Sequence, residues 1–197
     1  MGTRNLTAVY IDGEYKVAQY GQWDGYPGGQ GITCLEFLRD RCDMPKFKAN
    51  VRKATFLTPE EYNSILKKYG MGEDGMISAR DYDRLKIDMP ELSRDTGAEI
   101  LDIIQSREEG VKLENSISFA ADSLFCEWAW VIDLDANTFE AYEGFNKEPL
   151  TPEDRFYFLK EYNEGEYGGV KRVAMWHLDD LPTNDDFISA FKQEEEE

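Results

Sequence analysis

The fold is decided by residues 6–23, which read LTAVYIDGEYKVAQYGQW. Residues 6–11 are rich in β-forming side chains, and Asp12-Gly13 is a dipeptide typical of the two-residue turn that closes a β-hairpin. Residues 15–23 then return with the same β-forming character. The sequence therefore predicts that the chain opens with a β-hairpin.

A second hairpin is expected towards the other end of the chain. Along residues 128–134, large apolar side chains alternate with smaller or polar ones, which is the period of a strand with one buried face. An Ala136-Asn137 turn leads into a second strand over 139–142. Residues 170–177 read as a further strand.

The chain between the hairpins reads as largely helical. Thr58-Pro59 is a helix cap followed by proline at the first helical position, and Gly70 ends that helix. The pattern of a polar cap followed by an apolar face recurs twice more before residue 107. The predicted helices are 32–41, 58–69, 78–87, 96–105 and 184–191, with 70–75 as a flexible connector and 154–162 ambiguous between helix and strand.

These elements predict an α+β fold, in which an antiparallel sheet built from the N- and C-terminal hairpins is packed by helices from the central region. A chain of 197 residues, 41% of them hydrophobic, can bury one substantial core. We expect a single domain over residues 1–193 and a disordered acidic tail over 194–197.

The charge balance limits the partners of the protein. With 22 basic against 40 acidic residues the net charge is −18, so direct binding to nucleic-acid phosphates is not expected and partners should be neutral or basic. The sequence holds no apolar run of the roughly 20 residues that cross a bilayer and no signal-peptide pattern, so a cytoplasmic protein without membrane contact is expected.

The sequence suggests no metal site, no cofactor and no assignable catalytic residue. The three cysteines are widely spaced and lack a C-x-x-C pair, and His177 is the sole histidine that could complete a metal site. Buried, unreactive thiols are the favoured interpretation of Cys34 and Cys126.

The strongest candidate for a binding site is the glycine-rich segment 19–31. It holds five glycines, three aromatic residues and three glutamines, and glycine lets another group approach the backbone closely while aromatic faces suit a planar ligand. We predict a site for a small planar or phosphorylated ligand here, although a tight structural turn would use the same residues. The predicted ligand-binding residues are Arg4, Gln19, Gln22, Trp23, Asp24, Tyr26 and Gln30.

The opening Met1-Gly2-Thr3-Arg4, followed by a Tyr-x-x-Trp-Asp-Gly-Tyr-Pro-x-Gly-x-Gly segment, resembles a set of uncharacterised proteins of phages, prophages, bacteria and some fungi. The resemblance covers about the first 40 residues clearly, with weaker echoes in 126–142 and 178–182. It implies a non-enzymatic binding protein of phage or prophage type and suggests interference with a host defence system.

The same opening is also similar to the start of N-terminal-nucleophile hydrolases of the bile-salt-hydrolase type, which implies an amidohydrolase as the alternative function. In such enzymes the N-terminal amine activates its own side chain. Gly2 occupies the nucleophile position here and has no side chain, so the alternative requires processing that exposes Thr3.

Two modes of binding therefore stay open for a non-enzymatic protein. The segment 19–31 could sequester a small, nucleotide-like ligand, or the acidic surface could block a basic host protein with fast, electrostatically steered association. The sequence does not indicate the oligomeric state.

Overall fold

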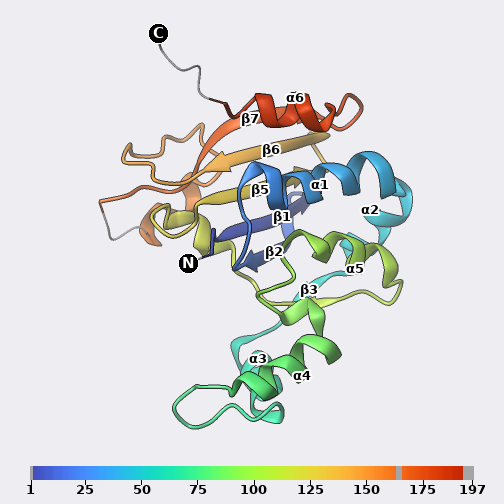
Figure 1. Cartoon of the computed structure of the whole chain (residues 1–197), viewed down its shortest axis with the longest axis vertical. Helices are drawn as coiled ribbons and strands as arrows, with labels where there is room; N and C mark the ends of the chain where they lie inside the picture. Colours follow the sequence, from blue (N-terminus) through green and yellow to red (C-terminus); the bar gives the residue numbers. More distant parts are fainter. Residues whose placement is uncertain (1, 163–165, 193–197) are drawn as a thin grey trace.

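The computed structural model describes residues 2–162 and 166–192, in which the two predicted hairpins join in one five-stranded sheet (Figure 1). The predicted tail, 194–197, lies outside the described residues. The strand order is β2-β1-β5-β6-β7. The strands are β1 (Asn5–Ile11), β2 (Glu14–Gly21), β5 (Trp128–Asp133), β6 (Thr138–Glu143) and β7 (Lys171–His177).

The α+β class is confirmed, and the sheet is antiparallel except at its centre, where β1 and β5 run parallel. The reason is the path of the intervening chain. Gly21 at the end of β2 and Trp128 at the start of β5 both pair with Asn5, so the helical excursion leaves and returns at the same end of the sheet. A strand that enters beside the start of β1 must then run in the direction of β1.

Four helices cover one face of the sheet. They pack on the alternating apolar side chains of the strands, among them Val9, Trp130, Ile132 and Phe139, which confirms the predicted buried face of 128–134. The helices are α1 (Ile32–Glu36), α2 (Met44–Lys53), α5 (Ile100–Ser106) and α6 (Asn184–Ser189). Wide π-type turns flank α1 on both sides, so the helical path runs from Pro27 to Arg41.

The opposite face of the sheet is covered by two short 3-10 helices, η5 (Ile117–Ala121) and η6 (Tyr157–Tyr162). Leu6, Ala8 and Val131 lie on this face and form a second apolar core with Phe156 and other residues from the covering segments. The sheet is thus buried on both sides, whereas the sequence patterns predicted helices on one side.

A helical hairpin projects from the β2 edge of the sheet. The short strands β3 (Thr55–Phe56) and β4 (Lys112–Leu113) pair in parallel, and α3 (Pro59–Lys68) and α4 (Ala79–Asp88) lie between them in the sequence. Figure 1 shows α3 and α4 at the far end of the molecule from α6. No residue of α3 is fully buried, and Leu85 is the buried residue of α4.

In the described part of the chain, no helix combines the length and the apolar character needed to cross a bilayer.

Candidate ligand-binding cavity

The glycine-rich segment forms the junction between β2 and α1, and two of its glycines fit closely around a buried tryptophan. The indole Nε1 of Trp130 donates a 2.9 Å hydrogen bond to the carbonyl oxygen of Gly25. A Cβ atom at Gly31 would lie 2.7 Å from the ring of Trp130, a distance that side chains do not tolerate. These glycines therefore allow the segment to pack directly on the sheet.

The aromatic residues of the segment lie at the surface. Trp23 and Tyr26 are 47% and 44% exposed. The indole Nε1 of Trp23 donates to Asp95 at 2.9 Å, and Gly2 lies so close beneath the ring that a Cβ atom there would approach it to 2.3 Å. Asp24 adopts the left-handed backbone conformation with φ of 54°, which turns the chain towards α1.

Two of the predicted glutamines make contacts within or beside the segment. Gln22 accepts a 2.7 Å hydrogen bond from the hydroxyl of Tyr20. The side chain of Gln30 donates to the carbonyl of Trp23 at 3.2 Å and accepts from the backbone N–H of Ala98 at 2.7 Å. These amides therefore link the segment to its surroundings.

The remaining two predicted residues lie apart from this surface. The guanidinium of Arg4 stacks over the ring of Phe125, 4.6 Å from its centroid. Gln19 is buried, donates to the carbonyl of Ser93 at 3.1 Å and lines a cavity on the side of α3 and α4. Gln22 is thus bonded within the segment and Gln30 links it to Ala98, whereas Gln19 contacts Ser93 and Arg4 contacts Phe125.

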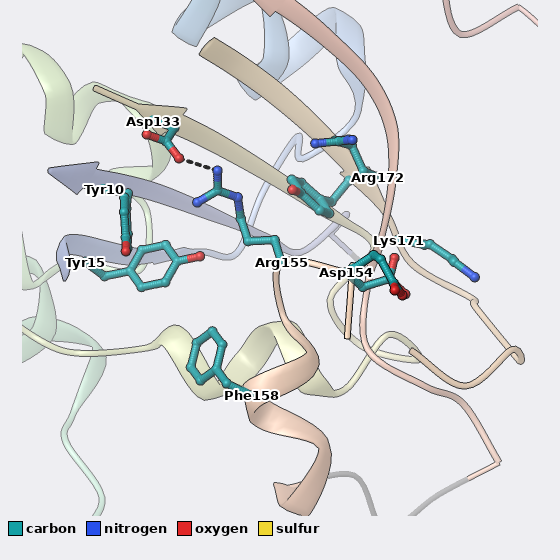
Figure 2. A pocket seen from close by; sticks show the side chains of 10 residues that line it. Tyr10, Tyr15, Asp133, Asp154, Arg155, Phe158, Lys171 and Arg172 are labelled. Atoms are coloured by element: carbon teal, nitrogen blue, oxygen red, sulfur yellow. Dashed lines mark hydrogen bonds and ion pairs between the residues drawn. The ribbon is translucent and has the colours of Figure 1, made fainter. Parts of the chain in front are cut away.

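A larger cavity, of about 530 Å³, opens on the sheet face opposite the four α-helices (Figure 2). Strand residues including Tyr10, Asp133 and Tyr142 line it, and the segment after β6 contributes Arg155 and Phe158. None of these belongs to the predicted ligand-binding set. The volume falls within the range of roughly 300–1,000 Å³ that small-molecule sites occupy.

Two irregularities in the strand register bring side chains to this cavity. In the first hairpin Val9 pairs with Val17 but Tyr10 pairs with Tyr15, so one extra residue of β2 turns Tyr15 onto the face of Tyr10. Between β6 and β7 the pairing skips Val173 and places Arg172 opposite Tyr142. Such bulges commonly redirect side chains beside functional sites.

Arg155 is the centre of a buried charged cluster beneath the cavity. Its Nε and Nη2 donate to the two oxygens of Glu140 at 3.0 and 2.9 Å, and Nη2 also donates to Asp133. Thr138 donates to Glu140 at 2.9 Å, and the hydroxyl of Tyr142 donates to its other oxygen. The side chains of Glu140 and Asp133 are only 3% and 7% exposed. One arginine therefore bridges two buried carboxylates, and Arg172 lies 3.9 Å from one of them.

The hydrogen bonds of this cluster keep Glu140 and Arg155 charged. Burial alone would raise the pKa of Glu140, but the bonds from Arg155 and Tyr142 outweigh burial and lower it. Burial likewise opposes the charge of Arg155, yet Glu140 and Asp133 raise the pKa of the guanidinium. Because Nε and Nη2 both bond to buried carboxylates, these contacts hold Arg155 in one position.

Two donors at the base of the cavity are left without acceptors. The hydroxyl oxygen of Tyr15 is buried and forms no hydrogen bond with the described residues. Nη1 of Arg155, whose Nε and Nη2 make the bonds to the carboxylates, also forms none with them. Figure 2 shows the Tyr15 hydroxyl directed towards the Arg155 guanidinium. Burial raises the pKa of Tyr15 to about 12 against the opposing effect of Arg155, so the hydroxyl stays protonated and can donate.

The sequence contains a signal for this cluster in strand β6. Glu140 stands between Phe139 and Ala141 in the middle of a strand, and both neighbours are buried against the helical face. The side chain of Glu140 lies on the opposite face of β6, which is also buried. A carboxylate buried there requires a neighbouring cation. Asp133, at the end of the apolar strand β5, gives a similar signal.

The other chemical candidates lie elsewhere. Thr3, the nucleophile of the alternative hydrolase, is half-buried, and its carbonyl accepts a 2.9 Å hydrogen bond from Gly25. Within 2–162 and 166–192, no group of three His, Cys, Asp or Glu side chains is arranged to hold a metal ion.

Comparison of the chain with models of protein families, with curated proteins and with solved structures found no match.

Proposed function

We propose that this protein is a non-enzymatic binding protein that takes a small planar ligand with a phosphate or another oxygen acceptor into the Arg155 cavity. The observation that carries the proposal is the pair of open donors, the Tyr15 hydroxyl and Nη1 of Arg155, at the base of a cavity of ligand size. The Tyr15 hydroxyl is buried without a partner among the described residues, which costs free energy, and a ligand oxygen would remove that cost.

The walls of the cavity support a planar ligand. Tyr10 and Tyr15 pack edge to face with their centroids 5.1 Å apart, and Phe158 lies 6.1 Å from Tyr15 in a tilted arrangement. Phe158 is also 54% exposed, which leaves part of its ring free for an occupant. Aromatic faces beside a few fixed polar groups are typical of small-molecule sites.

The local charge supports a ligand with an anionic group. The cavity lining has three basic residues against three acidic ones, and the buried Glu140 beneath it adds a fourth carboxylate, whereas the whole chain has 22 against 40. Lys171 and Arg172 stand on the β7 side of the cavity, and Arg155 lies between them and Asp133 (Figure 2). The electrostatic potential at this site is therefore less unfavourable for an anion than that of the average surface of the protein.

The biological setting of the proposal comes from the resemblance in residues 1–40. A phage or prophage protein that interferes with host defence could act by sequestering a nucleotide-like ligand in this cavity. The net charge of −18 favours a second mode, in which the acidic surface blocks a basic host protein. Capture of a basic protein that weakens as salt rises would support that second mode.

Calorimetric titration with adenosine and guanosine monophosphates, the corresponding nucleosides and inorganic phosphate tests the proposal. Tyr15→Phe removes the unpartnered hydroxyl and keeps the ring, so we expect it to weaken binding of a monophosphate about tenfold. Tyr26→Phe is the matched control, because it makes the same change in the glycine-rich segment. A loss with Tyr26→Phe but not with Tyr15→Phe would return the site to residues 19–31.

Failure of every probe to bind the unmodified protein would contradict the small-ligand proposal. The hydrolase alternative has its own measurement, the intact mass of the expressed chain. A chain that begins at Met1 or Gly2 leaves Thr3 internal and excludes the N-terminal-nucleophile mechanism.

A further inference from the structure

A second cavity, of about 150 Å³, lies where the α3–α4 hairpin meets the edge strand β2. Its walls come from β2, α3, α4, the segment that follows α4 and the segment after β4. A cavity of roughly this volume can hold a group of about the size of benzene. It is therefore suited to the end of one side chain or to a very small molecule, and it is separate from the Arg155 cavity.

Most of the wall is apolar or aromatic. Leu66, Leu85 and Leu92 contribute aliphatic surface, and three tyrosines, Tyr20, Tyr62 and Tyr82, also line the space. The hydroxyl of Tyr20 is bonded to Gln22, and the hydroxyl of Tyr82 accepts from the backbone N–H of Arg94 at 2.9 Å. Because both hydroxyls already have hydrogen-bond partners, an occupant of the cavity would contact the rings of Tyr20 and Tyr82.

One buried carboxylate in this wall lacks hydrogen bonds. Glu91 is 6% exposed, lines the cavity, and accepts no hydrogen bond from the described residues; its Oε2 is fully buried. The cation nearest to it is Arg107, whose Nη2 lies 3.5 Å from Oε2 outside hydrogen-bond geometry and is not part of the cavity wall. A buried carboxylate in this condition favours a donor that enters from the cavity.

The mouth of the cavity carries charges of both signs. Glu114 lines the rim, where burial of its carboxyl raises its pKa and the neighbouring Tyr62 opposes the rise. Arg94 is exposed, and its guanidinium lies over the ring of Tyr82, 5.1 Å from the centroid. The protein thus already places one cation, Arg94, which also lines the cavity, on a tyrosine of this wall.

We propose that this cavity binds an alkylammonium group, with its apolar stem against the leucines and its charged nitrogen beside Glu91 and the tyrosine rings. Aromatic rings attract such cations through their negative faces, and a carboxylate adds a charge-assisted hydrogen bond. An anion would meet two carboxylates, and a neutral apolar group would leave Glu91 with the 3.5 Å ion pair to Arg107 and no hydrogen-bond donor among the described residues. The net charge of −18 raises the local concentration of cations of either source, a free amine or a lysine side chain.

Calorimetric titration of the full chain with n-butylammonium tests this proposal, with n-butanol and butanoate as neutral and anionic probes of similar size. We expect binding of n-butylammonium alone. Nα-acetyl-lysine methylamide and a lysine-containing peptide form the second arm. A tighter peptide identifies a basic polypeptide as the source of the group, and a tighter free amine identifies a small metabolite.

Glu91→Gln keeps the shape of the side chain and removes its charge, and we expect it to weaken n-butylammonium binding about tenfold or more. Glu99→Gln is the matched control at an exposed carboxylate. Tyr62→Leu removes one ring from the half-buried face of α3 and provides an independent variant should Glu91→Gln fail to fold. Equal binding of n-butanol and n-butylammonium, no binding of n-butylammonium, or unchanged affinity in both folded variants would overturn the proposal.

Discussion

The two cavities differ in the hydrogen bonding of their buried carboxylate. In the Arg155 cavity, Glu140 receives hydrogen bonds from Arg155, Thr138 and Tyr142, and what remains open are donors. In the α3–α4 cavity, Glu91 receives none from the described residues, and what remains open is an acceptor. Burial alone therefore does not determine what a cavity binds; the hydrogen bonds left unmade determine it.

Removing Arg155 should change the free energy of unfolding more than any other substitution in this comparison. Arg155→Met leaves Glu140 and Asp133 buried without their cation, which should lower the free energy of unfolding by about 3–5 kcal/mol. Chemical denaturation measures this change. Arg172→Met is the control, because that arginine is half-exposed and 3.9 Å from Glu140, and it should cost less than about 1 kcal/mol. Equal losses in the two variants would show that Arg155 does not hold the cluster.

Neutralising each buried carboxylate gives the next largest contrast. Glu140→Gln weakens charge-assisted hydrogen bonds and should destabilise the protein by about 2 kcal/mol. Glu91→Gln removes a buried charge that accepts no hydrogen bond, so its stability should be unchanged or higher. Thermal and urea unfolding measures the free energy of unfolding of both variants. A larger loss of stability in Glu91→Gln than in Glu140→Gln would contradict the account.

A smaller effect is expected from pH. The folded protein lowers the pKa of Glu140 below its ordinary value of 4.5, so the unfolded chain binds the proton more readily than the folded one. The stability contributed by Glu140 is therefore fully present above pH 4.5 and is lost as pH falls towards the folded pKa. Unfolding curves measured at a series of acidic pH values should show this loss, and Glu140→Gln should make the curve flatter in that range.

Local features could be predicted from the sequence because they depend on neighbouring residues. The caps of the helices predicted at 58–69 and 78–87 are confirmed, since the side chains of Thr58 and Ser78 each accept from a backbone N–H three residues later. The cap expected at Thr96 is wrong, because its side chain makes no capping hydrogen bond. The hairpin at Asp12-Gly13 is also confirmed, because a two-residue turn depends on the residues within it. Alternation over 128–134 also identified the face that packs on the helices.

Contacts between distant segments could not be predicted in this way. The parallel pairing of β1 with β5 joins residues more than 120 positions apart, and no local pattern specifies its direction. The Arg155 cavity depends on two changes of register and on the segment after β6, which was ambiguous in the sequence. The glycine content of 19–31 does not distinguish a ligand site from close packing, and in the structure Gly31 allows Trp130 to pack against the segment while Gly21, Gly25 and Gly29 allow close approach of Asn5, Thr3 and Asp24.

The central claim, that the two cavities have opposite chemistry, is tested most directly by one calorimetric experiment on three proteins. A nucleoside monophosphate and n-butylammonium are titrated into the unmodified chain, Tyr15→Phe and Glu91→Gln. The account predicts that Tyr15→Phe weakens only the monophosphate and that Glu91→Gln weakens only n-butylammonium. Loss of both ligands in the same variant, or of neither in both variants, would contradict it.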